Sequence, residues 1–310
     1  MRGSIYNHLG TALRYLGERE RDPSWLKEAS EAFVNAQASW LRESNPFEWA
    51  AAQNNLANVL RAKAERSGDA ADFRVAIDAH REVLEIISFA EYPYVWARAH
   101  NNIGLSILGL ARSELGESVE KIGKYYQEAA SCFRAAISGV SRTDDPIIWA
   151  EFQNNLSTSL VGVGECFFDV YSIQAAVKAS RLALEEARRE RAPAVWARFQ
   201  ANLGNALRTL GEFSRDLTVL NDALVAYQES LLPYSETSSP IDWAKGNDNI
   251  AGVLVSIADI RGKGTVELEE AIRCAECALR VFEGAEAGGL AAVAKNNITR
   301  AKTLLSKRNK

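Results

Sequence analysis

The sequence predicts an all-α, right-handed superhelix of six helix-turn-helix units followed by one terminal helix. Three observations predict this fold. Five tryptophans recur at a nearly constant spacing, each follows a proline by three residues, and a tetrapeptide rich in asparagine recurs downstream of each tryptophan. A period of this length indicates a repeat array, in which each unit buries its apolar face against its neighbours.

Proline and tryptophan mark the start of the first helix in each unit. The tryptophans are 47, 53, 47 and 47 residues apart, and they are Trp49, Trp96, Trp149, Trp196 and Trp243. Proline fits the first helical turn because its missing N–H would be unpaired there. The residues before three prolines, Asn45, Asp145 and Ser239, are predicted N-caps. First helices are predicted near 3–17, 46–66, 93–112, 146–165, 193–211, 240–261 and 288–306.

Small and aromatic residues mark the second helix of each unit. Ala29, Phe33 and Ala36 form one helical stripe, and the same spacing recurs in five later copies. Second helices are predicted near 23–42, 70–88, 118–140, 169–190, 216–232 and 266–283.

The distances between these markers show where length is fixed. From the stripe's first alanine to the next asparagine column the distance is 26 residues in all six cases, as from Ala29 to Asn55. The distance within a unit varies instead, with six extra residues between about Ser113 and Tyr125. Stacking of unit on unit is therefore predicted to be rigid, and the inner turn to tolerate insertion.

The whole chain is predicted to be one array, with no separate domain. Its units span about 1–45, 46–92, 93–145, 146–192, 193–239 and 240–287, and the helix at 288–306 suits a polar cap. Residues 1–4 are expected to be a leader of vector origin.

Composition makes several classes of partner less favoured. The 310 residues carry 36 Lys and Arg against 40 Asp and Glu, a formal charge of -4. This balance gives no general reason to bind nucleic acid or an anionic membrane. Apolar runs are short, so neither a membrane helix nor a signal peptide is predicted, and a cytoplasmic location is the expectation.

Cysteine and histidine form no recognisable catalytic or metal site. Cys274 and Cys277 have a CxxC spacing, but no second ligand pair lies nearby, and their helix has small apolar positions that cysteine fills well. No nucleophile, zinc or phosphate-binding motif accompanies the three histidines. We therefore expect no enzyme activity, no metal and no cofactor.

The pattern resembles the tetratricopeptide repeat family over essentially the whole chain. The residues that carry the resemblance are the NNLA, NNIG and ANLG tetrapeptides, the alanine and aromatic stripe, and the proline that closes each unit. The unit of about 47 residues looks like a long bacterial version of the standard 34-residue repeat. The resemblance implies an adaptor that binds peptides or protein surfaces, often as the sensing part of a larger signalling protein.

The asparagine column supports two interpretations. An amide there either bonds to the neighbouring helix or offers a donor and an acceptor to the backbone of an extended peptide. The resemblance places this column in a concave groove, where Asn102, Asn155 and Asn202 are the central members.

The predicted peptide-binding site combines these amides with flanking cations and an apolar centre. Arg98 and Arg198 are assigned to acidic groups of the peptide, and Leu105 and Leu108 to an apolar side chain. A competing interpretation pairs Arg98 and Arg198 with Glu151 across units. The full predicted set is Asn55, Arg98, Asn102, Leu105, Leu108, Asn155, Arg198, Asn202 and Asn249.

The most favoured function is a non-catalytic scaffold that binds a protein or peptide and acts as a monomer. One alternative is an oligomerisation scaffold, whose groove is filled by another copy of the chain. Another is an enzyme whose residues converge only in three dimensions, which would need a deep pocket with perturbed carboxylates.

Overall fold

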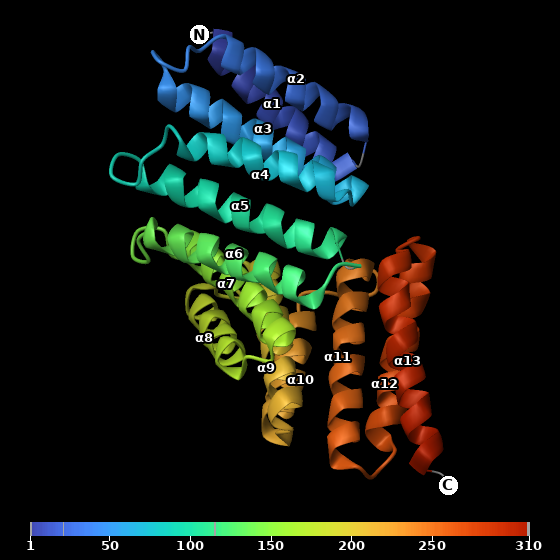
Figure 1. The fold of residues 1–310 in the computed structure, drawn as a ribbon. Helices are drawn as coiled ribbons and strands as arrows, with labels where there is room; N and C mark the ends of the chain where they lie inside the picture. The colour runs from blue at the N-terminus through green and yellow to red at the C-terminus, as the bar shows by residue number, and fades with distance from the viewer. Residues whose placement is uncertain (1, 21, 115, 309–310) are drawn as a thin grey trace. The chain divides into compact units, whose positions relative to one another are not determined.

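The computed structural model describes residues 2–20, 22–114 and 116–308, and the regular elements in these ranges are all α-helices (Figure 1). The chain divides into two compact units, Met1–Phe167 and Phe168–Lys310. Unit 1 contains α1 (Arg2–Glu20), α2 (Pro23–Ala38), α3 (Pro46–Ser67), α4 (Ala70–Leu84), α5 (Pro93–Ser113), α6 (Val119–Ser138) and α7 (Pro146–Phe167). Unit 2 contains α8 (Val170–Glu186), α9 (Pro193–Ser214), α10 (Leu217–Leu231), α11 (Pro240–Arg261), α12 (Val266–Gly284) and α13 (Gly288–Arg308).

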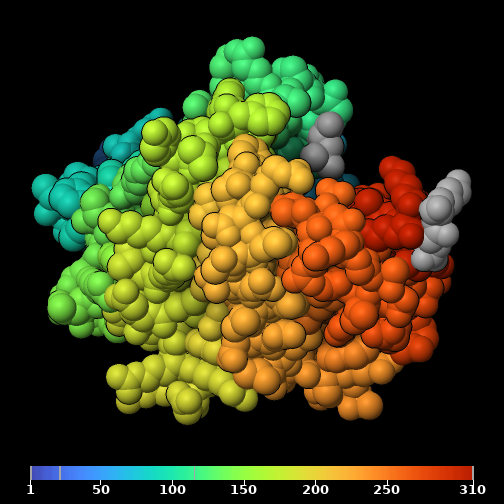
Figure 2. All heavy atoms as spheres, turned by 90° about the horizontal axis from the view of Figure 1, so that it is seen from below, coloured from blue at the N-terminus to red at the C-terminus, as the bar shows by residue number. Residues whose placement is uncertain are grey.

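This helix order confirms the predicted fold class of six helix-turn-helix pairs and a terminal helix. Inside each unit every helix packs on the next, and the first helices of successive pairs also touch one another. In unit 1 these first helices are α1, α3, α5 and α7, and in unit 2 they are α9, α11 and α13. Figure 2 shows the atoms of neighbouring pairs in unit 2, coloured amber to red, lying directly against one another.

Residues 2–4 belong to α1, and Gly3 is buried. A Cβ atom added at Gly3 would lie 2.6 Å from the ring of Trp40, so the backbone here approaches α2's end closely. Met1 lies outside the described residues, and the expected vector origin of residues 1–4 stays a prediction.

The turns that lead to each proline share one geometry. Asn45 N–H donates to the Leu41 carbonyl at 2.7 Å, and Trp49 N–H donates to the Asn45 carbonyl at 3.0 Å. The same two bonds recur before the four later tryptophans. Proline disfavours helical geometry at the preceding residue, so no helix runs through this turn into the proline. Four second helices end at residues 38, 84, 138 and 186, earlier than the predicted 42, 88, 140 and 190, because the turn takes up the residues between.

Asn45 and Ser239 are the N-cap residues of α3 and α11, as predicted, but neither side chain forms the expected capping hydrogen bond. Their carbonyls instead accept the tryptophan N–H. The side-chain caps lie at the start of second helices, where Asp22 and Asp69 each accept a backbone N–H at 2.8 Å. Asp169 and Asp216 do the same in unit 2.

Glycine in the first helix makes room for an aromatic ring in the second. A Cβ atom added at Gly104 would lie 2.8 Å from the ring of Phe133, and one at Gly204 would lie 2.6 Å from Tyr227. Gly10 faces Phe33 in the same way. The helices of these pairs can therefore approach only because the glycine has no side chain.

The tryptophans are half-buried at the helix starts rather than enclosed in the core. Arginines from the preceding turn lie over three of them: Arg42 over Trp49 at 5.1 Å, Arg142 over Trp149 at 4.7 Å and Arg189 over Trp196 at 5.7 Å from the ring centre. Each of these three tryptophans therefore makes a cation–π contact with an arginine of the preceding turn.

His80 takes the aromatic position of the second pair. It is fully buried in α4, and among the described residues neither ring nitrogen has a hydrogen-bond partner. Burial, with the nearby charge of Arg61, lowers the pKa of His80 to about 3. The imidazole is therefore neutral in the folded protein.

Acid should destabilise the protein through His80. The unfolded histidine, with a pKa of 6.5, binds its proton before the folded one does, so stability is full above that pH and falls as the pH drops toward 3. At pH 5 the loss is about 2 kcal/mol. Thermal unfolding followed between pH 7 and 5 should show this loss in the wild type and a smaller one in His80→Leu. Equal slopes for the two proteins would contradict the assignment.

Adding a methyl group at Gly104 should also destabilise the protein. Gly104→Ala forces the ring of Phe133 to move, which costs about 1 to 3 kcal/mol. Gly284→Ala is the matched control, because a Cβ atom there meets open space and the helix gains propensity. Urea unfolding should place Gly104→Ala below the wild type and Gly284→Ala at or above it.

Candidate functional site

The asparagine column forms a ladder of hydrogen bonds between successive first helices. The donors are the second asparagines of the tetrapeptides, and the acceptors are the first asparagines of the preceding helix-turn-helix repeat. In unit 1 Asn55 donates to Asn7 at 3.0 Å, Asn102 to Asn54 at 3.3 Å and Asn155 to Asn101 at 2.9 Å. Asn101 also donates to Asn102 at 3.4 Å, which links two rungs.

Three amides predicted to bind a peptide, those of Asn55, Asn102 and Asn155, thus donate their N–H groups to the neighbouring first helix instead. Asn102 is buried, whereas Asn55 and Asn155 are half-buried. Each amide keeps an oxygen that is able to accept a further bond. The geometry supports the structural interpretation of the column, and peptide contact by these residues stays a prediction.

Unit 2 repeats the ladder once with a carboxylate as the acceptor. Asn297 on α13 donates to the carboxylate of Asp248 at 2.8 Å, and both residues are buried. Burial raises the pKa of Asp248, although the Asn297 hydrogen bond and the charge of Arg208 oppose this shift.

Between α9 and α11 the acceptor position of the ladder is an alanine. Ala201 stands where the other units have asparagine or aspartate, so Asn249 on α11 finds no side-chain acceptor on α9. Among the described residues the half-buried Asn249 side chain has no hydrogen bond. This gap distinguishes the α9–α11 junction from the bonded rungs.

An open pocket of about 480 Å³ lies at this gap, and we call it the α9–α11 pocket. Three predicted site residues, Arg198, Asn202 and Asn249, line it together. Its remaining lining residues are Ala194, Val195, Ala197, Ala201, Asn205, Ser230, Tyr234, Asp242, Lys245 and Gly246. The pocket therefore combines a small apolar floor with cations, amides and a phenol.

Leu105 and Leu108 line a different pocket, which lies wholly in unit 1. It has a volume of about 560 Å³ and is bounded by Glu65, Phe73 and Arg112. Leu108 is 3% exposed and Leu105 is half-buried, so Leu105 offers more surface to a ligand.

The cations predicted along the first helices differ in their environment. Arg98 is exposed, with its guanidinium 5.9 Å from the ring centre of Tyr94. Arg14 and Arg61 each form an ion pair with the glutamate four residues later, Glu18 and Glu65. The glutamates partly neutralise these two arginines and lower the positive charge of the surface there.

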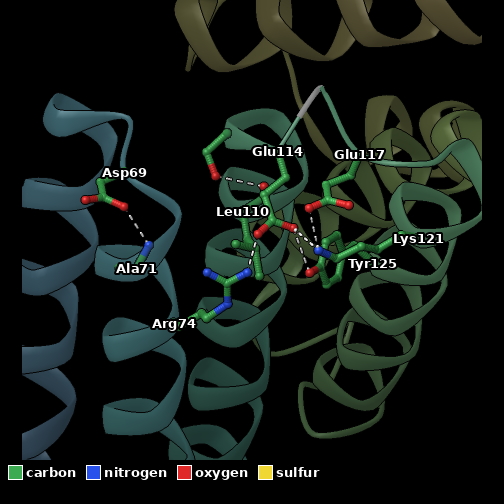
Figure 3. A network of polar contacts seen from close by, with 9 residues as sticks. Asp69, Ala71, Arg74, Leu110, Glu114, Glu117, Lys121 and Tyr125 are labelled. Atoms are coloured by element: carbon green, nitrogen blue, oxygen red, sulfur yellow. Dashed lines mark hydrogen bonds and ion pairs between the residues drawn. The ribbon is translucent and has the colours of Figure 1, made fainter.

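The inserted turn is fastened to the array by Glu114 (Figure 3). Its carboxylate accepts from Tyr125 at 2.8 Å, lies 3.1 Å from Lys121 and pairs with Arg74 of α4. Burial alone would raise the pKa of Glu114, but these three partners outweigh it and hold the pKa below its usual value. Residue 115 of the insertion lies outside the described residues.

The part of the chain that the structure describes contains no group of three or more metal-ligating side chains. All four cysteines there are free and half-buried, and burial raises the pKa of Cys274 to about 11. Among the same residues no helix has the length and hydropathy needed to span a bilayer.

Tyr234 is a pocket residue that the sequence did not indicate, and Lys245 is one that the repeat pattern places on the same face without being assigned to the site. Tyr234 follows a second helix, outside the column where groove residues were sought. Lys245 stands one column earlier than Asn249, at the position of Arg98 and Arg198, and this spacing was a usable signal.

Comparisons with known proteins agree with this architecture. Residues 49–88 match a family model described as tetratricopeptide repeat. A comparison with curated proteins gave no significant match. The solved structure of the assembly chaperone of RpL4 (Acl4), residues 1–338, is 15% identical, covers 97% of each chain and has a TM-score of 0.57, a likeness that shows the fold alone.

Two further solved structures are less similar. The apo form of RapI is 14% identical, with 99% of this chain and 100% of that chain covered and a TM-score of 0.47. BtubC (BKLC) from P. vanneervenii is 17% identical, with 92% and 91% covered and a TM-score of 0.44. At these scores neither likeness bears on the function of this chain.

Removing a ladder donor should lower stability only where the rung exists. Asn297→Ala leaves the buried Asp248 carboxylate without its donor and should cost about 1.5 to 3 kcal/mol. Asn249→Ala changes the same position of the preceding helix-turn-helix repeat. It breaks no ladder bond and should cost much less. Urea unfolding of both variants tests this contrast, and equal losses would contradict a role of the ladder in stability.

Proposed function

Since residues 49–88 match a tetratricopeptide repeat and the described helices follow one repeat pattern, we propose that this chain is a non-catalytic scaffold that binds an extended protein segment. Such arrays present the faces of successive helices to a partner. The observation that carries the proposal is the α9–α11 pocket, which brings together three residues assigned to peptide binding from the sequence alone.

The composition of the candidate surfaces favours a peptide over a small substrate. Both pockets are open, and each is lined by neighbouring helices of one array. Amides that offer both a donor and an acceptor suit a peptide backbone, and arginines suit carboxylates. Within the described residues, His80 has its pKa lowered by burial and lies in the core rather than in a pocket, so it is not placed to act on a substrate.

The proposal includes the finer expectations from the sequence. The chain acts as the sensing or adaptor part of a larger bacterial signalling protein of the long-unit type, and it binds its partner as a monomer. Unit 1 contributes Asn55, Arg98, Asn102, Leu105, Leu108 and Asn155, and unit 2 contributes Arg198, Asn202 and Asn249. The rival function is self-assembly, in which a second copy occupies these surfaces.

Light scattering separates the two functions. A mass that stays at 34.1 kDa over a wide range of concentration supports a monomeric scaffold. A mass that rises to that of a dimer in the wild type, but stays at that of a monomer in Arg198→Ala, would favour self-assembly instead.

With a partner in hand, salt should change the effect of the two arginines. Replacing Arg98 and Arg198 by alanine should weaken binding more at low salt than at high salt, because exposed charges are screened within about 8 to 10 Å near physiological ionic strength. Calorimetric titration of wild type and double variant at two salt concentrations measures this. If the double variant binds with wild-type affinity at both salt concentrations, the two arginines do not belong to the binding site.

A further inference from the structure

Two turns of unit 1 expose large apolar side chains at one edge of the array. These turns lead from α2 to α3 and from α4 to α5, and they lie at the same end of these helices (Figure 1). The rings of Phe47 and Tyr92 contact each other with their centres 5.0 Å apart, yet the two residues are 39% and 40% exposed. Leu41 and Phe89, in the same turns, are 66% and 47% exposed. We call these four residues the aromatic edge, and a gathering of this kind marks an interaction surface.

The repeat pattern changes at Phe89. Arginine comes seven residues before the tryptophan in three other turns, where Arg42, Arg142 and Arg189 lie over the ring of that tryptophan. Phe89 comes seven residues before Trp96, and its ring meets the Trp96 ring edge-on at 5.1 Å. Phenylalanine thus replaces the arginine of the other turns and adds one more exposed ring to the edge.

The charge around the aromatic edge is negative. Residues 41–48 and 85–94 hold one cation and four carboxylates, so their formal charge sums to -3. The cation, Arg42, is already paired with Glu85 at 2.7 Å. The other three carboxylates are exposed and form no ion pair among the described residues, and they are Glu43, Glu48 and Glu91.

This combination of rings and carboxylates is not shared by every turn of the array. The turn that leads to α9 in unit 2, residues 187–194, contains three arginines, one glutamate and no aromatic side chain. The repeat fold therefore does not require exposed rings or carboxylates at these positions.

Rings beside unpaired carboxylates suit a cation. A guanidinium or ammonium group is attracted to the face of an aromatic ring and also pairs with a carboxylate. An acidic partner would instead be repelled, because like charges in contact oppose association. The chain itself shows the favoured contact, since Arg42 both lies over Trp49 and pairs with Glu85.

We propose that the aromatic edge binds an arginine- or lysine-bearing segment of a partner protein. The cation of this segment lies against the rings of Phe47, Phe89 and Tyr92 and pairs with the unpaired carboxylates beside them. The surface consists of turns rather than of the two pockets. It is therefore a second contact, beyond the proposed function, and its test is separate from that of the pockets.

One substitution separates recognition from folding. Phe89→Arg gives this turn the residue that three other turns of the chain carry over their tryptophan. The variant should therefore fold as the wild type does. Its own guanidinium occupies the place of the partner's cation and repels it, so binding should be lost while stability is kept.

The test selects a phage-displayed library of short random peptides on the full wild-type chain, after phage that bind Phe89→Arg have been removed. Enriched peptides are synthesised with a fluorescent label. Their affinities are measured by anisotropy against wild type, Phe89→Arg, Phe47→Ala and Glu43→Gln. Circular dichroism and urea unfolding confirm that each variant is folded.

Two control variants accompany these measurements. Glu190→Gln is matched to Glu43→Gln, because Glu190 holds the same repeat position in the turn that leads to α9. Arg198→Ala changes the α9–α11 pocket and leaves the aromatic edge intact.

We expect the enriched peptides to contain Arg or Lys and to bind Phe89→Arg about tenfold more weakly or worse, since a cation–π contact and a charge repulsion both change. Phe47→Ala and Glu43→Gln should each weaken binding about threefold or more. Replacing the basic residue of a peptide by glutamine should have a similar effect. Glu190→Gln and Arg198→Ala should bind as the wild type does.

Several results would overturn the inference. Enriched peptides without a basic residue, or no enrichment after the removal step, would reject the aromatic edge as a site for cations. Peptides that lose affinity in Arg198→Ala but not in Glu43→Gln would bind the α9–α11 pocket, which rejects this inference and supports the proposed function. A wild-type dimer that Phe89→Arg converts to a monomer would instead make the edge an interface between two copies. If the library yields no peptide even without the removal step, the proposed function fails as well.

Discussion

The fixed contact between one unit and the next is the constraint on which the rest of the structure depends. Five second helices are followed by a turn whose two backbone hydrogen bonds lead to a proline at the start of the next helix, as from Leu41 to Trp49. The distance from the second-helix alanine to the next asparagine column stays at 26 residues, because one extra residue would rotate every contact of the next helix. Insertions are tolerated only in the inner turn, where Glu114 fastens the extra residues to α4.

Side-chain size follows from this fixed distance between helices. Where the second helix carries Phe33, Phe133 or Tyr227, the facing helix carries glycine, since no other residue leaves space for the ring. His80 fills the same position in the second pair at an electrostatic cost, because its ring is buried without a hydrogen bond.

The amide ladder holds successive first helices together through one column of residues. An asparagine in the middle of a helix is unfavourable by propensity, and an interhelical hydrogen bond compensates for it. Where the acceptor is missing, as at Ala201, the donor of Asn249 forms no ladder bond. A repeat array, whose units otherwise resemble one another, thereby acquires one position that differs from the rest, and Ala201 is that position in unit 2.

The sequence by itself determined the helix order and the alignment of the asparagine column, because these depend on local periodicity and on proline. It left open what the asparagines contact, and it predicted side-chain capping bonds at Asn45 and Ser239 that the structure does not have. Only the tertiary structure decided that Asn155 bonds to Asn101, that Leu105 and Asn249 line separate pockets, and that Tyr234 joins the second of them. These facts depend on distances between helices, and residues 48 or 54 positions apart carry no local signal of their contact.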